Sequence, residues 1–166
     1  MNEIEQHLPA LQVVVPMLSA AVVMLLKPRG LAWAASTAVS LFAFAIAISM
    51  TLVTLDGGTL QYFMGGWQAP YGIELRVDAL STLMLLVVTG ASSVALVAGS
   101  HSIDSQIEVE RQPLFYAAWL LVLAGLCGIL VSADAFNIFV FMEVSSLASY
   151  VLIAGGPDRR ALPSVF

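Results

Sequence analysis

The sequence is poor in charged residues and in the side chains that build disulfide, metal and redox sites. Only 10% of its 166 residues are Asp, Glu, Lys or Arg, compared with roughly 25% in soluble domains. The single cysteine, Cys127, excludes an intrachain disulfide, and the isolated His7 and His101 offer no metal-ligand spacing. No flavin, haem or iron–sulfur motif is present, and no basic patch with interleaved aromatic residues supports nucleic-acid binding. The sequence therefore predicts no cofactor, no metal and no nucleic-acid partner.

Long apolar runs dominate the chain instead. Hydrophobic residues make up 60% of it, and the mean hydropathy is +0.94. Five runs have about the 20-residue length that a helix needs to cross a hydrocarbon core; they cover residues 8–26, 31–55, 80–99, 114–131 and 135–154. We therefore expect an all-α, multi-pass membrane protein with five transmembrane helices in a lipid bilayer. Pro16 is expected to kink the first helix without ending it.

The basic residues are distributed unevenly over the connections between these runs. Arg76 falls on one side of the predicted membrane, and the other side carries Lys27, Arg29, Arg111, Arg159 and Arg160. Cytoplasmic connections of membrane proteins carry the excess of Lys and Arg. The N-terminus is therefore predicted to lie outside, and residues 155–166 in the cytoplasm.

The longest connection, residues 56–77, contains two glycine pairs. Such turn residues delimit short elements, so residues 59–63 and 73–77 could pair as strands. We expect a small extracytoplasmic hairpin between the second and third helices. An interfacial loop anchored by Trp67 and Tyr71 is the alternative.

Two other connections differ in length and charge. Residues 132–134 are so few that the fourth and fifth helices should form a tight antiparallel pair. Residues 100–113 carry several acidic side chains, and we expect this loop to be solvated and available to another subunit.

Glu143 is a lone carboxylate in the middle of the apolar run at 135–154. A charged side chain at this depth costs at least a few kcal/mol if it faces lipid, and such residues usually mark ion or proton pathways. A carboxylate in low dielectric needs a cationic partner to stay ionised, yet no predicted span holds a Lys or Arg near its middle. We expect Glu143 to hold or pass a proton with a partner supplied from elsewhere. A hydrogen bond that only fixes helix packing is the alternative.

Helical periodicity groups further polar side chains with this glutamate. Ser146 and Tyr150 fall on the face of Glu143 at 100° per residue, Ser149 flanks the C-terminal half of that face, and Asn137 lies at the outer end of the same span. A carboxyl group beside hydroxyl groups can hold a chain of water molecules, which a proton relay requires. These four residues are the predicted supports of the proton path.

Other polar and small residues have structural interpretations. Asp134 precedes the fifth run and Asp78 the third, and Asp at these positions favours the N-cap of a helix. The small residues at 90–93 suit close contact between helices.

Two stretches are similar to a known family. GGWQAPYGIELRVDALSTLM, residues 65–84, resembles the segment that enters the third helix of antiporter-like membrane subunits. SADAFNIFVFMEVSSLASYVLIAG, residues 132–155, resembles their fifth helix with its functional glutamate. The family includes the A and D subunits of multisubunit Mrp-type Na+/H+ antiporters and the proton-pumping membrane subunits of NADH-quinone oxidoreductase (complex I) and of membrane-bound hydrogenases. The motifs resemble those of the Mrp D subunit most, and the similarity begins at the first span.

The resemblance implies that Glu143 pairs with a lysine on a seventh helix. It also implies protons and Na+ as the transported ions, other membrane subunits as partners, and the inner (plasma) membrane of a prokaryote as the location. Family members have many more helices than this sequence, whose last residues, RRALPSVF, resemble the approach to a sixth helix. We therefore expect a fragment of the N-terminal part or one half of a split subunit, with the lysine on the missing part.

Three functions are compatible with these expectations. The first is a subunit of a multisubunit Na+/H+ antiporter that contributes Glu143 to a proton path. The second is a proton-translocating membrane subunit of NADH-quinone oxidoreductase or a membrane-bound hydrogenase, in which electron transfer on partner subunits drives the same local chemistry. The third is an inactive truncated fragment or a scaffold.

Overall fold

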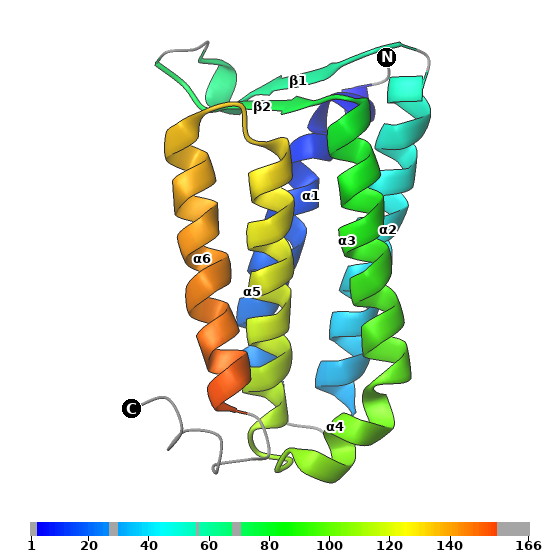
Figure 1. Ribbon diagram of the computed structural model, residues 1–166, viewed down its shortest axis with the longest axis vertical. Coiled ribbons are helices and arrows are strands. Elements are labelled where there is room, and N and C mark those ends of the chain that lie inside the picture. Colours follow the sequence, from blue (N-terminus) through cyan, green and yellow to red (C-terminus); the bar gives the residue numbers. More distant parts are fainter. Residues whose placement is uncertain (1–2, 27–29, 56, 68–70, 156–166) are drawn as a thin grey trace.

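The chain folds into a bundle of long helices, seen in a computed structural model that describes residues 3–26, 30–55, 57–67 and 71–155. Five helices in these ranges are long and apolar enough to cross a membrane. They are α1 (Glu3–Met24), α2 (Leu31–Leu55), α3 (Ala79–Ala98), α5 (Gln112–Val131) and α6 (Ala135–Ala154). The five predicted helices are thus confirmed, and α1 continues through Pro9 and Pro16. They run side by side, with a two-stranded hairpin at one end and the short helix α4 at the other (Figure 1).

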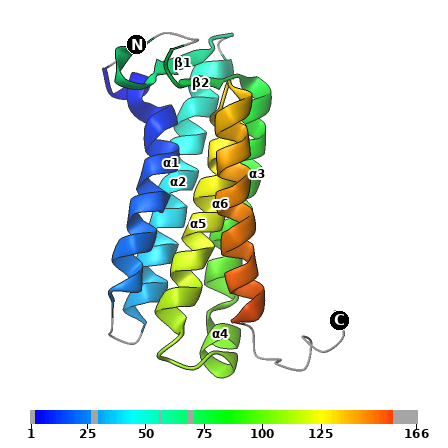
Figure 2. The same cartoon turned by 90° about the vertical axis from the view of Figure 1, so that its left-hand side faces the viewer.

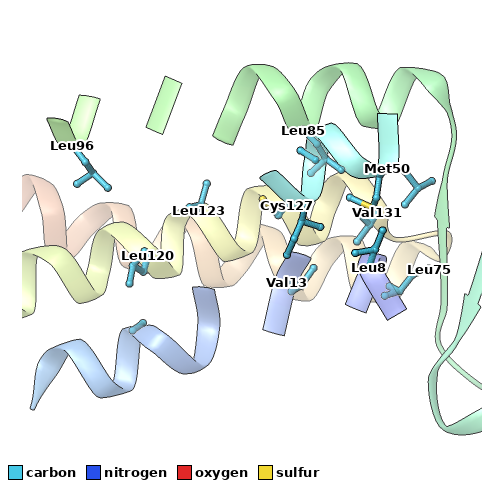
Figure 3. Close-up of a cluster of buried hydrophobic side chains, with 14 of the residues drawn as sticks. Leu8, Val13, Met50, Leu75, Leu85, Leu96, Leu120, Leu123, Cys127 and Val131 are labelled. Carbon is cyan, nitrogen blue, oxygen red and sulfur yellow. The ribbon is translucent and has the colours of Figure 1, made fainter. Parts of the chain in front are cut away.

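Helix α5 forms the centre of the bundle. It packs against α1, α2, α3 and α6. Its buried residues include consecutive positions such as Tyr116, Ala117 and Ala118, so more than one face of this helix is covered. Figure 3 shows Leu120, Leu123, Cys127 and Val131 of this helix among apolar side chains of α1, α2, α3 and the hairpin. Because α5 is surrounded, it holds the other helices in register around one core.

The predicted hairpin is present and closes one end of the bundle. Strands β1 (Leu60–Phe63) and β2 (Glu74–Val77) pair antiparallel, with Leu60 opposite Val77 and Phe63 opposite Glu74. The side chains of Leu60, Leu75 and Val77 are almost fully buried, because alternate strand residues point to one face and this face lies on the helix ends.

A short 3-10 turn, Met64–Gly66, follows β1. Gly65 and Gly66 have φ angles of 68° and 78°, a conformation that only glycine adopts readily. Trp67 and Tyr71, which flank residues 68–70 outside the described ranges, are exposed.

The connection between α5 and α6 is fastened to the hairpin. The backbone N–H of Ala133 donates to the carbonyl of Glu74 over 3.1 Å, and Ser132 forms an isolated bridge with Leu75. The predicted tight pair of helices is therefore confirmed, and β2 fixes where α6 begins.

The loop expected at residues 100–113 contains a helix that the sequence analysis did not predict. Ser100–Gln106 form α4 directly after α3. Most of its side chains are exposed, as expected for a solvated segment, but Ile103 packs against the core and Ile107 is buried. Two isoleucines four residues apart are enough to hold one helical turn against the core. They are too few to show a helical period of apolar residues in the sequence.

Which end of the bundle faces the cytoplasm stays a prediction. Lys27, Arg29, Arg159 and Arg160 lie outside the described residues. Arg76 is on β2 and Arg111 precedes α5, so these two residues lie at opposite ends of the bundle, as expected (Figure 2).

Candidate functional site

Helix α6 begins at a carboxylate cap. One oxygen of Asp134 accepts a hydrogen bond from the backbone N–H of Asn137 over 2.9 Å, and its other oxygen accepts one from the Asn137 side-chain amide. The cap satisfies one of the N–H groups that a helix start leaves unpaired. Asp78 caps α3 in the same way by accepting from Ser81 N over 2.8 Å. Both predicted caps are confirmed.

Glu143 lies near the middle of α6. It is eight residues after Ala135 and eleven before Ala154, or about 12 Å and 16 Å from the two ends at 1.5 Å per residue. Its side chain is exposed. Within residues 3–26, 30–55, 57–67 and 71–155, no hydrogen bond or ion pair reaches it; the single ion pair there joins Arg111 and Glu108.

The face around Glu143 is apolar and has no partner helix among the described residues. Its large side chains are strongly exposed, at 74% for Phe136, 61% for Leu147 and 67% for Tyr150. Helix α6 packs mainly on α5 and lies on the side of the bundle away from α1 and α2 (Figure 2). Only 17% of the residues in its apolar span are buried, compared with 56% of those in the α5 span. A carboxylate therefore stands in the middle of an uncovered, aromatic-rich surface.

The opposite face of α6 makes a close contact with α5. A Cβ atom on Gly125 of α5 would lie 2.7 Å from the Cβ atom of Ser145 and 2.8 Å from the carbonyl oxygen of Phe141. Ser145 is buried there and donates to the carbonyl of Met142 over 2.9 Å. The absence of a side chain at position 125 thus sets the distance between the two helices, and with it the position of Glu143.

The structure separates the predicted supporting residues into two groups. Ser146 and Tyr150 share the exposed face with Glu143. Ser149 is half-buried, and its hydroxyl donates to the carbonyl of Ser145 over 2.7 Å. Asn137 is buried beside Asp134. The first two remain candidates for a path that includes Glu143, whereas Ser149 and Asn137 are engaged in the helix itself.

A second polar cluster at membrane depth was not predicted. Ser40 of α2 hydrogen-bonds to Ser92 over 2.9 Å and to Ser93 over 3.1 Å. The indole N–H of Trp119 on α5 also donates to Ser92 over 2.9 Å. Two of the small residues at 90–93, Ser92 and Ser93, therefore contact neighbouring helices, and they do so through hydrogen bonds, whereas Ala91 is exposed. A serine and a tryptophan far apart in the sequence give no local sign of this cluster.

Gln12 is another buried polar residue that the sequence analysis did not single out. It is fully buried on α1, and its amide nitrogen donates to the sulfur of Cys127 over 3.6 Å. The sign of this contact in the sequence is a glutamine within an otherwise apolar span. Its contact with α5 ties α1 to the centre of the bundle.

Comparison with known proteins finds similar membrane subunits of two kinds. The N subunit of the NADH-quinone oxidoreductase of Desulforudis audaxviator is 40% identical over 165 residues, which cover 96% of this chain and 32% of that protein. The D subunit of a Na+/H+ antiporter of Bacillus subtilis is 32% identical over 153 residues, 92% of this chain and 30% of that protein. The D subunit of a probable K+/H+ antiporter of Rhizobium meliloti is 35% identical over 157 residues, 90% and 28% of the two chains. The chain therefore spans about a third of the length of the curated relatives that it matches.

Solved structures of membrane complexes contain the same fold. A chain of the Mrp complex from Dietzia sp. DQ12-45-1b matches 90% of this chain with a TM-score of 0.77 and 29% identity. A chain of the membrane-bound sulfane sulfur reductase, an archaeal respiratory membrane complex, matches 86% with a TM-score of 0.78 and 26% identity. The matches cover 27% and 29% of those two chains. No family model matches the sequence.

Proposed function

Because this chain belongs to the family of antiporter-like membrane subunits, we propose that it carries Glu143 as a proton-transfer site in a multisubunit Na+/H+ antiporter. The chain is a multi-pass membrane protein, and the members that it resembles are subunits of multisubunit membrane complexes. The prokaryotic inner (plasma) membrane is the proposed location.

The observation that carries this proposal is a carboxylate at mid-membrane depth on an uncovered helix face. An ionised side chain facing lipid at this depth costs about 2.5–3.5 kcal/mol on insertion scales. Protein or water therefore has to cover this face in the working assembly. A covering element with a basic side chain would stabilise the ionised glutamate, and we propose a lysine for that role, on another chain or on residues beyond this sequence.

The proposed mechanism uses the two states of this pair. When the lysine is close, it favours the carboxylate form of Glu143, which releases a proton. When the lysine withdraws or loses its charge, the low dielectric favours the protonated carboxyl group, which takes up a proton. Ser146 and Tyr150 on the same face can hydrogen-bond the water molecules that deliver it. Coupling arises if Na+ on one side of the complex favours one of the two states.

Na+-driven proton movement in membrane vesicles that contain the complete complex tests the role of Glu143. We expect Glu143→Gln to abolish proton movement, because the amide has the same shape but cannot exchange a proton, and Glu143→Asp to retain part of it. Glu110→Gln is the matched control, since Glu110 is an exposed acid outside the spans. If Glu143→Gln retained full activity, the proposal that this glutamate is part of the proton path would be wrong. The same assay with K+ in place of Na+ identifies the cation.

A second function is favoured by the 40% identity to the N subunit of an NADH-quinone oxidoreductase. In that case electron transfer on partner subunits drives proton movement through the same glutamate. Purification of the complex through a tag on this chain distinguishes the two. Subunits with flavin or iron–sulfur clusters would indicate the redox complex, whereas only small membrane subunits would indicate the antiporter.

An inactive scaffold is the third candidate, because no described span supplies a basic partner for Glu143. If the chain only supports its neighbours, Glu143→Gln leaves proton movement unchanged while deletion of the chain prevents assembly of the complex. This pair of results would favour the scaffold over both transport functions.

A further inference from the structure

Two pockets lie one after the other along α5, which stands between α6 and α3 (Figure 1). The first, at the α4 end of the bundle, has a volume of about 280 Å³. It is lined by Arg111, Leu114, Phe115, Val151, Ala154 and Gly155. The second has a volume of about 420 Å³, and its lining includes Trp119, Val122 and Leu126 of α5, Leu152 of α6 and small and apolar residues of α3.

Five of the α5 residues that line these pockets fall on one face of the helix. Arg111, Phe115, Trp119, Val122 and Leu126 follow one another at intervals of three or four residues, which keeps them within about 80° of one another at 100° per residue. The ring centroids of Phe115 and Trp119 are 6.1 Å apart, so the two pockets adjoin at these rings. More of α5 is buried than of any other described span, and this stripe of five residues, the α5 groove, is an opening in its cover.

Arg111 places a positive charge at the mouth of the α5 groove. It is the N-cap residue of α5, just outside the apolar span, at the depth where the polar headgroup region of a bilayer begins. Its Nε atom lies 3.4 Å from the carboxylate of Glu108, but the two side chains are 52% and 80% exposed, and exposed ion pairs contribute little to stability. A guanidinium group has five N–H donors in a fork that matches a phosphate group, so Arg111 can bind a phosphate in addition to Glu108 or in place of it.

Below Arg111 the α5 groove is apolar and has the length of one lipid chain. The indole N–H of Trp119 donates to Ser92 over 2.9 Å, so its polar atom is already satisfied. No second charged side chain lines either pocket among the residues that the structure describes. Arg111 and Val122 are eleven residues apart, or about 17 Å at 1.5 Å per residue. One leaflet supplies half of a hydrocarbon core that is about 30 Å thick, so this distance matches the depth of a single leaflet.

We propose that the α5 groove binds an anionic phospholipid, with its phosphate group on the Arg111 guanidinium and one acyl chain along Phe115, Trp119 and Val122. Basic pockets between transmembrane helices on the cytoplasmic side bind anionic lipid head groups, and the end of the bundle that carries Arg111 is the one predicted to face the cytoplasm. A phospholipid presents an anionic group at the depth of Arg111 and an apolar chain below it, which matches both parts of the groove. The site does not include Glu143 and does not depend on the proposed transport function.

Photo-crosslinking in the complete complex tests this lipid site. The complex is reconstituted in vesicles of equal parts phosphatidylglycerol and phosphatidylcholine, with photoreactive benzoylphenylalanine in place of Val122 or, on the α6 wall, in place of Val151. We expect both positions to form adducts with phosphatidylglycerol about five times more often than with phosphatidylcholine, the ratio that an attraction of about 1 kcal/mol per basic residue gives. Arg111→Gln should return the ratio to that of the vesicle, and Arg111→Lys should keep part of the preference.

Val94 of α3 is the matched control position for the same probe. It is 68% exposed and lines a pocket between α2 and α3 whose described lining carries no charge, so its adducts should follow the composition of the vesicle. Equal yields of the two lipids at Val122 and Val151 would overturn the proposal, and so would a preference that Arg111→Gln leaves unchanged. Crosslinks to protein in place of lipid would show that a helix fills the groove, which would also overturn it.

Discussion

The contact between α5 and α6 gives a prediction whose size can be worked out from the structure. In Gly125→Ala the new Cβ atom would lie 2.7 Å from the Cβ atom of Ser145 and 2.9 Å from the Ser145 backbone nitrogen. Carbon atoms in contact are separated by about 3.5–4.0 Å, so α6 has to move away by about 0.8 Å or more. The atoms in the way include α6 backbone, so a change of rotamer cannot relieve the overlap.

Overpacking of this kind costs about 1–3 kcal/mol. Replacing glycine by alanine within a helix stabilises it by about 0.5–1 kcal/mol, which offsets part of this cost. Gly90→Ala on α3 has the same intrinsic gain, but its Cβ atom would meet only the outer edge of the Phe44 ring, at 3.2 Å. We therefore expect Gly125→Ala to be less stable than Gly90→Ala by about 1–3 kcal/mol.

Thermal unfolding followed by a thiol-reactive dye measures this difference, because Cys127 is the only cysteine and is fully buried. The same two variants are compared in the transport assay. A displacement of about 1 Å can reduce the rate of a positioned group up to about a hundredfold, so Gly125→Ala should impair proton movement more than Gly90→Ala. Equal stability of the two variants would refute the argument that glycine sets the distance between the helices.

Two further predictions concern polar groups. The hydrogen bond between Trp119 and Ser92 should couple α5 to α3. A double-mutant cycle of Trp119→Phe and Ser92→Ala should therefore give a coupling free energy of about 0.6 kcal/mol and no more than about 1.7 kcal/mol. If the losses of stability in the two single variants simply add up in the double variant, the prediction is contradicted. The backbone N–H of Ser81 lowers the pKa of the Asp78 carboxyl group. The resulting stabilisation is present above the ordinary pKa and is lost as the pH falls through the lowered pKa. Below about pH 4, acidification should therefore lower the unfolding temperature of the wild type more than that of Asp78→Asn, and parallel curves would count against the cap.

The spans, the hairpin and both helix caps could be predicted because each depends on local physics. A helix in lipid must satisfy its own backbone groups, so about 20 apolar residues suffice to identify it. Glycine pairs predict the turn, and an aspartate before an apolar run predicts the cap. Helix α4 could not be found in this way, because two isoleucines dock it on a core that only the tertiary structure creates.

The role of the residues expected to support Glu143 stays a prediction, but helix geometry divides them into two groups. Tyr150 is seven residues from Glu143, a rotation of about 700°, which brings it back to within about 20° of the same direction. Ser149 and Asn137 are six residues away in opposite directions, and each is rotated about 120° from Glu143. They therefore face α5 or the helix start. The sequence analysis places Ser149 beside the face of Glu143 and Asn137 at the outer end of the span, and neither residue points in the direction of Glu143.

The uncovered face of α6 combines exposed apolar side chains, which are stable in lipid, with a carboxylate, which is not. Phe136, Phe139 and Leu147 would be stable against acyl chains, and their exposure by itself indicates nothing more than a lipid-facing helix. Glu143 lies among them at mid-depth, where an apolar side chain would save about 2.5–3.5 kcal/mol relative to an ionised one. A face that remained in lipid would have no physical reason to keep this carboxylate. We therefore expect cysteines introduced on this face to show one of two results in the assembled complex: either they react with water-soluble thiol reagents, or protein shields them from every reagent. Cysteines on the outer face of α2 should react only with lipid-soluble reagents, and the same behaviour on the face of Glu143 would contradict this expectation.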